Sequence, residues 1–215
     1  MDMPQKNTED KWIETSRGVD SINFQRSAHI TWVSVLMAMV VFVLAEKTYD
    51  ILGKILTSGR WYLLLYVIAS GLIVIQTWVQ MTWLTLLSHS PIQASRSGIT
   101  LLMGIAIYII CVSVESPAIW FLAAGFFGII SCLSLINGMR QRLITGQVAR
   151  SLYKFVAVIG ISVCITFLAA WHLTIKPSAL TAWFWGVIAI ILMTNFLWLQ
   201  SRNMKEERSD LDIPA

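Results

Sequence analysis

Charged residues are scarce in this sequence. Asp, Glu, Lys and Arg make up 13% of its 215 residues, whereas soluble globular domains carry roughly 25%. Hydrophobic residues make up 56%, and the mean hydropathy is +0.68. So few ionised side chains cannot cover the surface of a water-soluble domain of this size. The composition therefore argues against a soluble globular protein and predicts an integral membrane protein.

Cysteine and histidine are also scarce, and their positions exclude most metal and haem sites. The sequence has three of each, namely Cys111, Cys132, Cys164, His29, His89 and His172. The cysteines lie in apolar segments without any Cys-x-x-Cys motif, so neither a disulfide framework nor a zinc site is expected. The histidines are scattered along the chain and cannot pair as axial haem ligands between helices. We therefore predict no metal and no cofactor.

Sequence motifs of enzymes are missing as well. The sequence has no Gly-x-Ser-x-Gly motif, no phosphate-binding glycine loop and no pair of aspartates within an apolar segment. We therefore predict no catalytic residue, and an enzyme acting on a lipid or quinone through Glu46 or Glu115 is the weakest hypothesis. The net charge of +4 does not indicate nucleic-acid binding, because the basic residues are spread over several short segments.

Six long apolar runs dominate the rest of the sequence. The hydrocarbon core of a bilayer is ~30 Å thick and needs ~20 apolar residues in a helix, because each residue rises ~1.5 Å. The runs lie near residues 29–49, 62–87, 98–115, 118–138, 152–173 and 180–200. Over such lengths, only helices satisfy their own backbone groups in lipid. We predict an all-α, polytopic integral membrane protein, with a bundle of six transmembrane helices in a single domain, residues 29–200.

Polar segments flank this predicted domain on both sides. Residues 1–28 are polar and mixed in charge, and Trp12, Val19 and Ile22 follow a loose helical spacing. That segment either extends into the cytoplasm or lies along the membrane surface as an amphipathic helix. Residues 201–215 carry many charges and no hydrophobic pattern, which predicts a disordered cytoplasmic tail.

The connections between the apolar runs are short and carry residues typical of helix starts. Glu115-Ser116-Pro117 joins the third and fourth runs. Ser116 suits the N-cap position, and Pro117 suits the first helical position, where its missing N–H costs nothing. The segment at 176–178, Lys-Pro-Ser, separates the fifth and sixth runs in a similar way.

Lys and Arg are distributed unevenly between the two sides of the predicted bundle. With the N-terminus inside, the inner segments hold twelve of the 16 and the outer segments four. Because positive residues favour the cytoplasmic side, we predict both termini in the cytoplasm and the protein in the plasma (inner) membrane. Tryptophans prefer the two interfaces. Five of them fall at outer helix ends in this orientation: Trp61, Trp120, Trp171, Trp183 and Trp185.

Two glutamines stand out in the second apolar run. Gln76 and Gln80 are four residues apart, so they share one face of a helix. An amide in hydrocarbon needs a polar partner, and this face is therefore expected to point at another helix or at water. Thr194 and Asn195 in the sixth run are the expected partners. Two interpretations stay open: hydrogen bonds that hold helices together, or the lining of a polar path.

Charged residues interrupt the apolar pattern at the end of the first run. Glu46, Lys47 and Asp50 lie about 20 residues beyond its start, where a spanning helix reaches the outer interface. They mark either that boundary or the mouth of a pathway. Glu115 follows the third run, and it either faces water or joins Glu46 and Asp50 in an outer acidic cluster.

These features leave two main hypotheses for the function. The first is a small channel or transporter subunit that passes an ion or small solute along the glutamine face. The second is a non-catalytic accessory or assembly subunit of a larger membrane complex, in which the polar residues hold helices together. Either requires a lipid bilayer, and a homo-oligomer or other membrane subunits are the expected protein partners.

Overall fold

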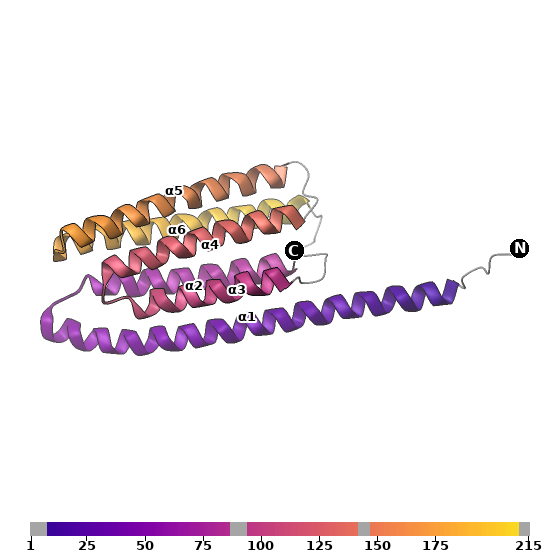
Figure 1. The fold of residues 1–215 in the computed structure, drawn as a ribbon, viewed down its shortest axis with the longest axis horizontal. Coiled ribbons are helices and arrows are strands. Elements are labelled where there is room, and N and C mark those ends of the chain that lie inside the picture. Colours follow the sequence, from indigo (N-terminus) through magenta and orange to yellow (C-terminus); the bar gives the residue numbers. More distant parts are fainter. Residues whose placement is uncertain (1–7, 87–93, 142–146, 211–215) are drawn as a thin grey trace, which may run out of the picture.

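The protein is a bundle of six helices that run alternately up and down (Figure 1). The computed structural model describes residues 8–86, 94–141 and 147–210. The helices are α1 (Thr8–Ser58), α2 (Leu63–Leu86), α3 (Ala94–Val112), α4 (Pro117–Gln141), α5 (Gln147–Ile175) and α6 (Ala179–Asp210). All regular secondary structure in the described ranges is helical, which confirms the predicted all-α class. The central helix is α2, which contacts α1, α3, α4 and α6.

Three tight turns lie at one end of the bundle, which we call the tight-turn end, and α2, α4 and α6 run from it toward the far end (Figure 1). Gly59 ends α1 with a φ of +67°, and its N–H donates to the Ile55 carbonyl at 2.9 Å. A glycine adopts this left-handed conformation without the penalty that a Cβ brings. The first turn therefore follows directly from the sequence.

The predicted helix starts at the other two turns are confirmed. Pro117 is the first residue of α4, and the preceding Ser116 carbonyl accepts a hydrogen bond from the Trp120 N–H at 2.9 Å. At α6, the Ser178 hydroxyl accepts from the Thr181 N–H at 3.1 Å, which satisfies one of the donors that a helix start leaves open.

The first helix is longer than the sequence pattern predicted. It was expected to span residues 29–49, but α1 is a single helix of 51 residues that projects beyond the other helices at the far end (Figure 1). Nothing between Glu46 and Ser58 breaks a helix, so α1 continues to Gly59. At 1.5 Å per residue it is roughly 75 Å long, more than twice the thickness of a bilayer core.

The last helix is longer too, and this corrects the predicted disordered tail. α6 continues through the polar segment as far as Asp210. Lys, Glu and Arg are good helix formers, and adding residues to an existing helix requires no new nucleation. Of the expected tail, only residues 211–215 lie outside the described residues.

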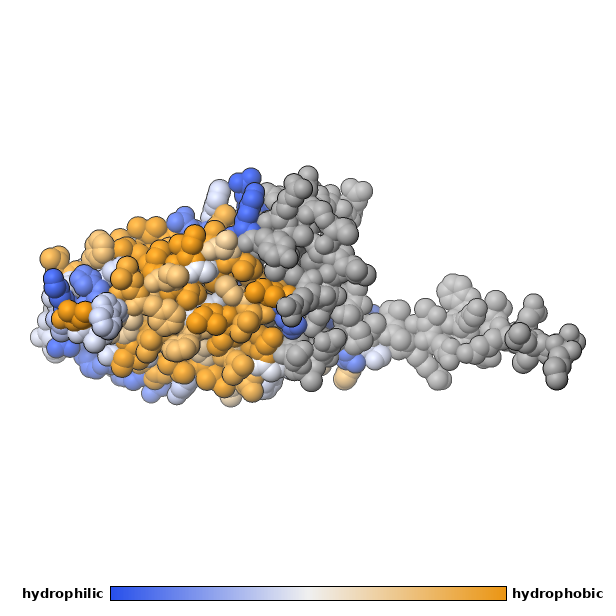
Figure 2. Space-filling view, turned by 45° about the horizontal axis from the view of Figure 1, so that its top comes forward, coloured by the Kyte–Doolittle hydropathy of each residue, from blue (hydrophilic) through white to orange (hydrophobic). Residues whose placement is uncertain are grey.

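Apolar side chains cover the outside of the bundle. Each helix exposes large apolar residues, for example Phe42, Ile75, Ile105, Phe126, Leu168 and Ile191. Figure 2 shows apolar side chains as a band across one face, with hydrophilic side chains gathered at the tight-turn end. An apolar surface this extensive is not found on soluble monomers. It is the surface expected of a bundle inside a membrane.

Five of the six helices are long and apolar enough to cross a bilayer. The third is the exception among the described residues, because its apolar part, Ser97–Val112, is shorter than the others. Nevertheless α3 lies alongside α1 and α4 within the bundle (Figure 1). The structure therefore supports a multi-pass helical bundle with five clear candidate spans and a shorter sixth helix.

Small residues allow two pairs of helices to approach closely. On α4, a Cβ added to Gly128 would lie 2.5 Å from Cγ2 of Val163, and one added to Gly125 would lie 3.0 Å from Thr166 Oγ1. On α6, a Cβ at Gly186 would lie 2.9 Å from Leu65 on α2. Membrane helices associate through such small-residue contacts, because lipid provides no hydrophobic driving force between them. The α4–α5 pair is accordingly the most extensive contact in the bundle.

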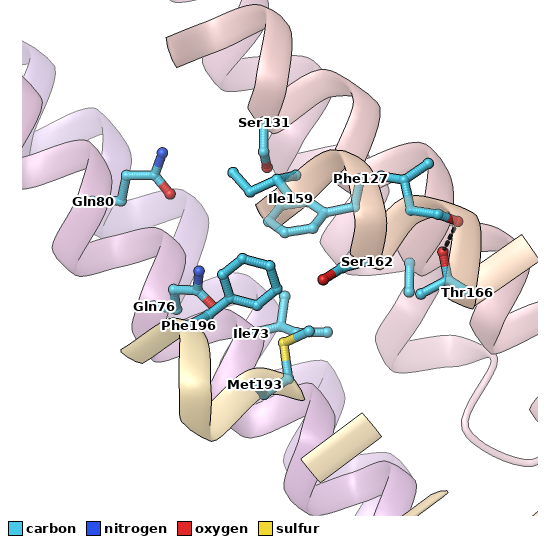
Figure 3. A pocket seen from close by; sticks show the side chains of 13 residues that line it. Ile73, Gln76, Gln80, Phe127, Ser131, Ile159, Ser162, Thr166, Met193 and Phe196 are labelled. Carbon is cyan, nitrogen blue, oxygen red and sulfur yellow. Dashed lines mark hydrogen bonds between the residues drawn. The ribbon is translucent and has the colours of Figure 1, made fainter. Parts of the chain in front are cut away.

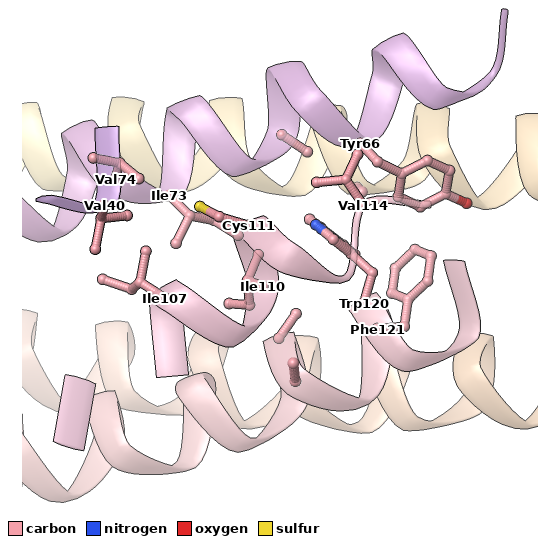
Figure 4. Packing of buried hydrophobic residues seen from close by; sticks show 14 of the residues in the cluster. Val40, Tyr66, Ile73, Val74, Ile107, Ile110, Cys111, Val114, Trp120 and Phe121 are labelled. Atoms are coloured by element: carbon pink, nitrogen blue, oxygen red, sulfur yellow. The ribbon is translucent and has the colours of Figure 1, made fainter. Parts of the chain in front are cut away.

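The apolar core has residues from all six helices, and Figure 4 shows part of it around α1, α2, α3 and α4. Ile73 and Val74 of α2 pack there with Ile107 and Cys111 of α3 and Val40 of α1. The buried side chains are large and branched, as in the close-packed interior of a soluble protein.

Replacing Gly128 with Ala is expected to destabilise the bundle. The β-branched Val163 has little rotamer freedom on a helix, so the new methyl group forces the helices apart, at a cost of about 1–3 kcal/mol. The matched control is Gly160→Ala on α5, where nothing lies within 4 Å of the added Cβ. Thermal unfolding in detergent should show a lower Tm for Gly128→Ala and an unchanged or higher Tm for Gly160→Ala. Equal Tm values for both variants would contradict the close packing.

Candidate functional site

A small cavity lies between α2, α4, α5 and α6 (Figure 3). Its volume is about 40 Å³, and a water molecule needs at least ~10–15 Å³ measured in this way, so about three waters fit. Thirteen residues line it: Ile73, Gln76, Gln80, Ala124, Phe127, Gly128, Ser131, Ile159, Ser162, Val163, Thr166, Met193 and Phe196. The cavity collects polar side chains from several helices at the middle of the bundle.

The two glutamines selected from the sequence both line this cavity. Gln76 and Gln80 are 8% and 6% exposed, and in Figure 3 their amides lie on the side of the space formed by α2. Their spacing of four residues places both on the face of α2 that points away from lipid. The sequence argument that these amides avoid hydrocarbon therefore agrees with the structure.

Three hydroxyl groups complete the polar lining, and none of them was singled out from the sequence. Ser131 comes from α4, and Ser162 and Thr166 come from α5. All three are buried. On α5, Ser162 and Thr166 are four residues apart, like the two glutamines on α2. Serine and threonine are common in apolar helices and often bond only to their own backbone, which is why the sequence alone gave no signal for them.

Two polar atoms in the lining have no hydrogen-bond partner among the described residues. They are Nε2 of Gln80 and Oγ of Ser131. A buried polar group without a partner costs roughly 1–3 kcal/mol, so such atoms are rare in folded proteins. Because both residues face a cavity with room for water or a small molecule, their hydrogen bonds are available to a bound species.

An aromatic cluster closes the bundle between the cavity and the tight-turn end. Tyr66, Trp120, Phe121 and Trp185 pack edge to face, with ring centroids 5.0–6.1 Å apart. Tyr66, Trp120 and Phe121 appear together in Figure 4. The polar ends of the rings are satisfied: the Tyr66 hydroxyl donates to the Ala182 carbonyl at 2.8 Å, and Trp120 Nε1 donates to Ser70 Oγ at 2.9 Å. We call these four residues the aromatic plug.

A second apolar cluster lies between the cavity and the far end. It consists of Leu135, Phe155, Ile159 and Phe196, which pack together. Leu135 and Phe155 lie farther toward the far end than the polar lining residues of α4 and α5, whereas Ile159 and Phe196 also line the cavity. We call these residues the far-end plug. The polar cavity is thus bracketed along the bundle axis by two apolar clusters.

Thr194 and Asn195 do not join the glutamines, which corrects the expected partnership. Both side chains are exposed, and neither lines the cavity. The Thr194 hydroxyl donates to the Ile190 carbonyl of its own helix at 2.8 Å. The face of α6 that meets α2 presents Met193 and Phe196 instead. The sequence positions of Thr194 and Asn195 predicted their depth along α6, but not the face of the helix on which they lie.

The three acidic residues do not assemble into one cluster. Glu115 pairs with Lys54, and Asp50 lies 3.8 Å from Lys47. Glu46 is exposed on α1. None of them lines the cavity, which lies between other helices. No group of three His, Cys, Asp or Glu residues that could hold a metal occurs in the described part of the chain. Exposed ion pairs such as these contribute little stability, about 0–1 kcal/mol each.

Several tryptophan and histidine side chains lie in surroundings other than those expected from the sequence. Trp120 and Trp185 were expected in an interfacial belt, but both are buried in the aromatic plug. His172 accepts a hydrogen bond at Nδ1 from Trp185 Nε1 at 2.9 Å, so it supports that cluster. His29 is buried on α1. His89 lies outside the described residues.

No family model matches the chain, and neither the curated proteins nor the solved structures contain a match. The class of protein therefore follows from its own geometry. The protein is an integral membrane protein of the multi-pass helical type, with a small polar cavity inside its bundle.

The hydrogen bond inside the aromatic plug gives a direct test of its geometry. Tyr66→Phe removes the hydroxyl that bonds to Ala182 and leaves a buried carbonyl with one partner fewer. We expect a loss of about 0.5–1.5 kcal/mol in stability. Tyr49→Phe is the matched control, because Tyr49 is 80% exposed. Chemical denaturation in mixed micelles should separate the two variants, and an unchanged midpoint for Tyr66→Phe would rule out this bond.

Proposed function

We propose that the protein is a membrane transporter that moves a small solute or ion through the cavity between α2, α4, α5 and α6. One observation carries the proposal: buried polar side chains from three helices surround an open space at the middle of an otherwise apolar bundle. Placing polar groups at membrane depth is costly, and they are usually functional where they occur. Transporter binding sites typically lie near the bilayer midplane between helices.

The apolar clusters on both sides of the cavity favour a carrier over an open channel. A channel needs a continuous polar path across the membrane. Here the aromatic plug and the far-end plug interrupt any such path. A carrier instead holds its solute in a site that opens to one side at a time.

The alternative is an accessory subunit in which the glutamines join helices together. Such a role predicts direct hydrogen bonds between the glutamine amides and neighbouring helices. Nε2 of Gln80 has no such partner among the described residues. The open space beside the amide therefore supports transport more than a purely structural role.

For the orientation, we propose that both termini are cytoplasmic and that the protein resides in the plasma membrane. The support is the excess of Lys and Arg in the segments at the far end, twelve of the 16 in the sequence. The tight-turn end then faces outward and the projecting part of α1 lies inside. A homo-oligomer or a complex with other membrane subunits is compatible with the exposed apolar surface of α1.

The transport proposal is tested by Gln76→Leu in proteoliposomes. Osmotic swelling with urea, glycerol, alanine and potassium chloride identifies a permeant solute for the unaltered protein. The substitution removes an amide from the cavity and should reduce that flux about tenfold or more, because a solute loses hydrogen bonds worth about 1–3 kcal/mol. Asn195→Leu replaces an exposed amide of the same bundle and should leave the flux unchanged.

Absence of flux for every solute tested, in protein that stays folded and monodisperse, would reject the transport proposal. Loss of a co-purifying membrane protein on Gln76→Leu, without any flux in the starting protein, would favour the accessory subunit.

The orientation is tested by labelling single cysteines in a variant without the three native ones. Lys176→Cys lies at an exposed position of the tight-turn end, and Arg202→Cys at an exposed position of the far end. In intact cells a membrane-impermeant maleimide should label Lys176→Cys only. Arg202→Cys should react only after the cells are permeabilised, and the reverse pattern would invert the topology.

A further inference from the structure

We infer that the solute is a small uncharged molecule with both hydrogen-bond donors and acceptors, of the size of urea or acetamide. The inference rests on the proposed transport function and narrows its substrate class. It is argued from the charge of the lining, from the direction of its hydrogen bonds and from its size.

None of the described lining residues carries an ionisable side chain. All thirteen residues around the cavity are apolar, amide or hydroxyl residues. The described ion pairs, Lys47–Asp50 and Lys54–Glu115, belong to α1 and to the tight-turn end. An ion that enters such a site loses its hydration without gaining a counter-charge, which costs several kcal/mol even after relaxation. Charged solutes are therefore strongly disfavoured.

The unpartnered amide also argues against a bare cation. Hard cations bind sets of several oxygen ligands. Nε2 of Gln80 instead presents a buried N–H₂ group without an acceptor among the described residues, and a cation cannot satisfy it. A bound cation would therefore leave this donor without a partner.

The lining presents both hydrogen-bond acceptors and donors to the cavity. On α5, the Ser162 hydroxyl donates to the Val158 carbonyl at 3.0 Å, and the Thr166 hydroxyl donates to the Val163 carbonyl at 2.8 Å. With their protons used, these oxygens offer lone pairs to the cavity and act as acceptors. On the α2 side, each glutamine amide carries an N–H₂ donor and a carbonyl acceptor, and Nε2 of Gln80 is a donor without a partner among the described residues.

Ser131 of α4 supplies a further hydroxyl, and its oxygen has no partner among the described residues. Figure 3 shows this side chain directed toward the space between the glutamines and α5. A solute that both donates and accepts can satisfy all these groups at once. A molecule with acceptors alone, such as an ether, leaves the α5 hydroxyl oxygens unmatched.

The size of the cavity favours a small solute. About 40 Å³ corresponds to about three waters, or roughly three to four non-hydrogen atoms. Urea and acetamide have this size and carry an N–H₂ donor and a carbonyl acceptor. The apolar walls at Ile73, Phe127 and Met193 tolerate a methyl group. Sugars, amino acids and nucleotides are larger than this volume.

The experiment measures solute flux in proteoliposomes by stopped-flow light scattering. Urea, acetamide, glycerol, glycine and potassium chloride are the probes, and protein-free liposomes give the leak rate. We expect urea and acetamide to enter at least tenfold faster than the leak rate, glycerol more slowly, and glycine and potassium chloride at the leak rate. Ser131→Ala should reduce the urea rate about fivefold, as expected for the loss of a hydrogen bond worth about 1 kcal/mol.

Ser113→Ala is the matched control, because Ser113 is exposed at the tight-turn end and bonds to its own helix. It should not change the urea rate. Flux of potassium chloride or glycine without flux of urea or acetamide would overturn the substrate class and leave the transport proposal standing. Urea flux that is unaffected by Ser131→Ala would overturn the assignment of this cavity as the route. Leak rates for all probes would reject the transport proposal itself.

Discussion

A polar side chain at membrane depth must find a polar partner or water inside the protein, and this constraint orders the whole bundle. Each apolar helix satisfies its backbone by itself, so the backbone does not decide which face points inward. The side chains of Gln76 and Gln80 do. They lie on the face of α2 that lines the cavity with α4, α5 and α6, and α2 also contacts α1 and α3.

Close helix packing and the cavity are two results of the same residues on α4. Gly128 lets α5 approach so closely that an added Cβ would clash with Val163, and both residues also line the cavity. One turn farther along α4, Ser131 replaces apolar surface with a hydroxyl. The cavity exists because α4 and α5 touch tightly, whereas Gln76 and Gln80 keep α2 from closing against them with an equally tight apolar seam.

Much of this architecture could be predicted from the sequence, because the relevant signals are local. Apolar length gives the helices, Ser116-Pro117 gives the start of α4, and the spacing of Gln76 and Gln80 gives their common face. The partners across the cavity could not be predicted, because the rotation of each helix about its axis depends on packing against several neighbours. Asn195 illustrates this, since it has the expected depth but the opposite orientation.

Two helices are also longer than predicted, for a physical reason. Apolar length reports only the part of a helix that lies in lipid, and polar residues such as those at 205–210 extend a helix without any hydrophobic signal. The same holds for α1, whose N-terminal part carries mixed charges.

The great length of α1 has a mechanical consequence. Among the described helices, α2 and α3 make its main contacts, and roughly 22 Å of helix precedes its apolar part, since that part begins at Asn23. A tilt of about 10° where α1 meets the bundle displaces the tip of such a helix by about 4 Å. Small adjustments in helix packing are thereby converted into larger displacements of the N-terminal end of α1.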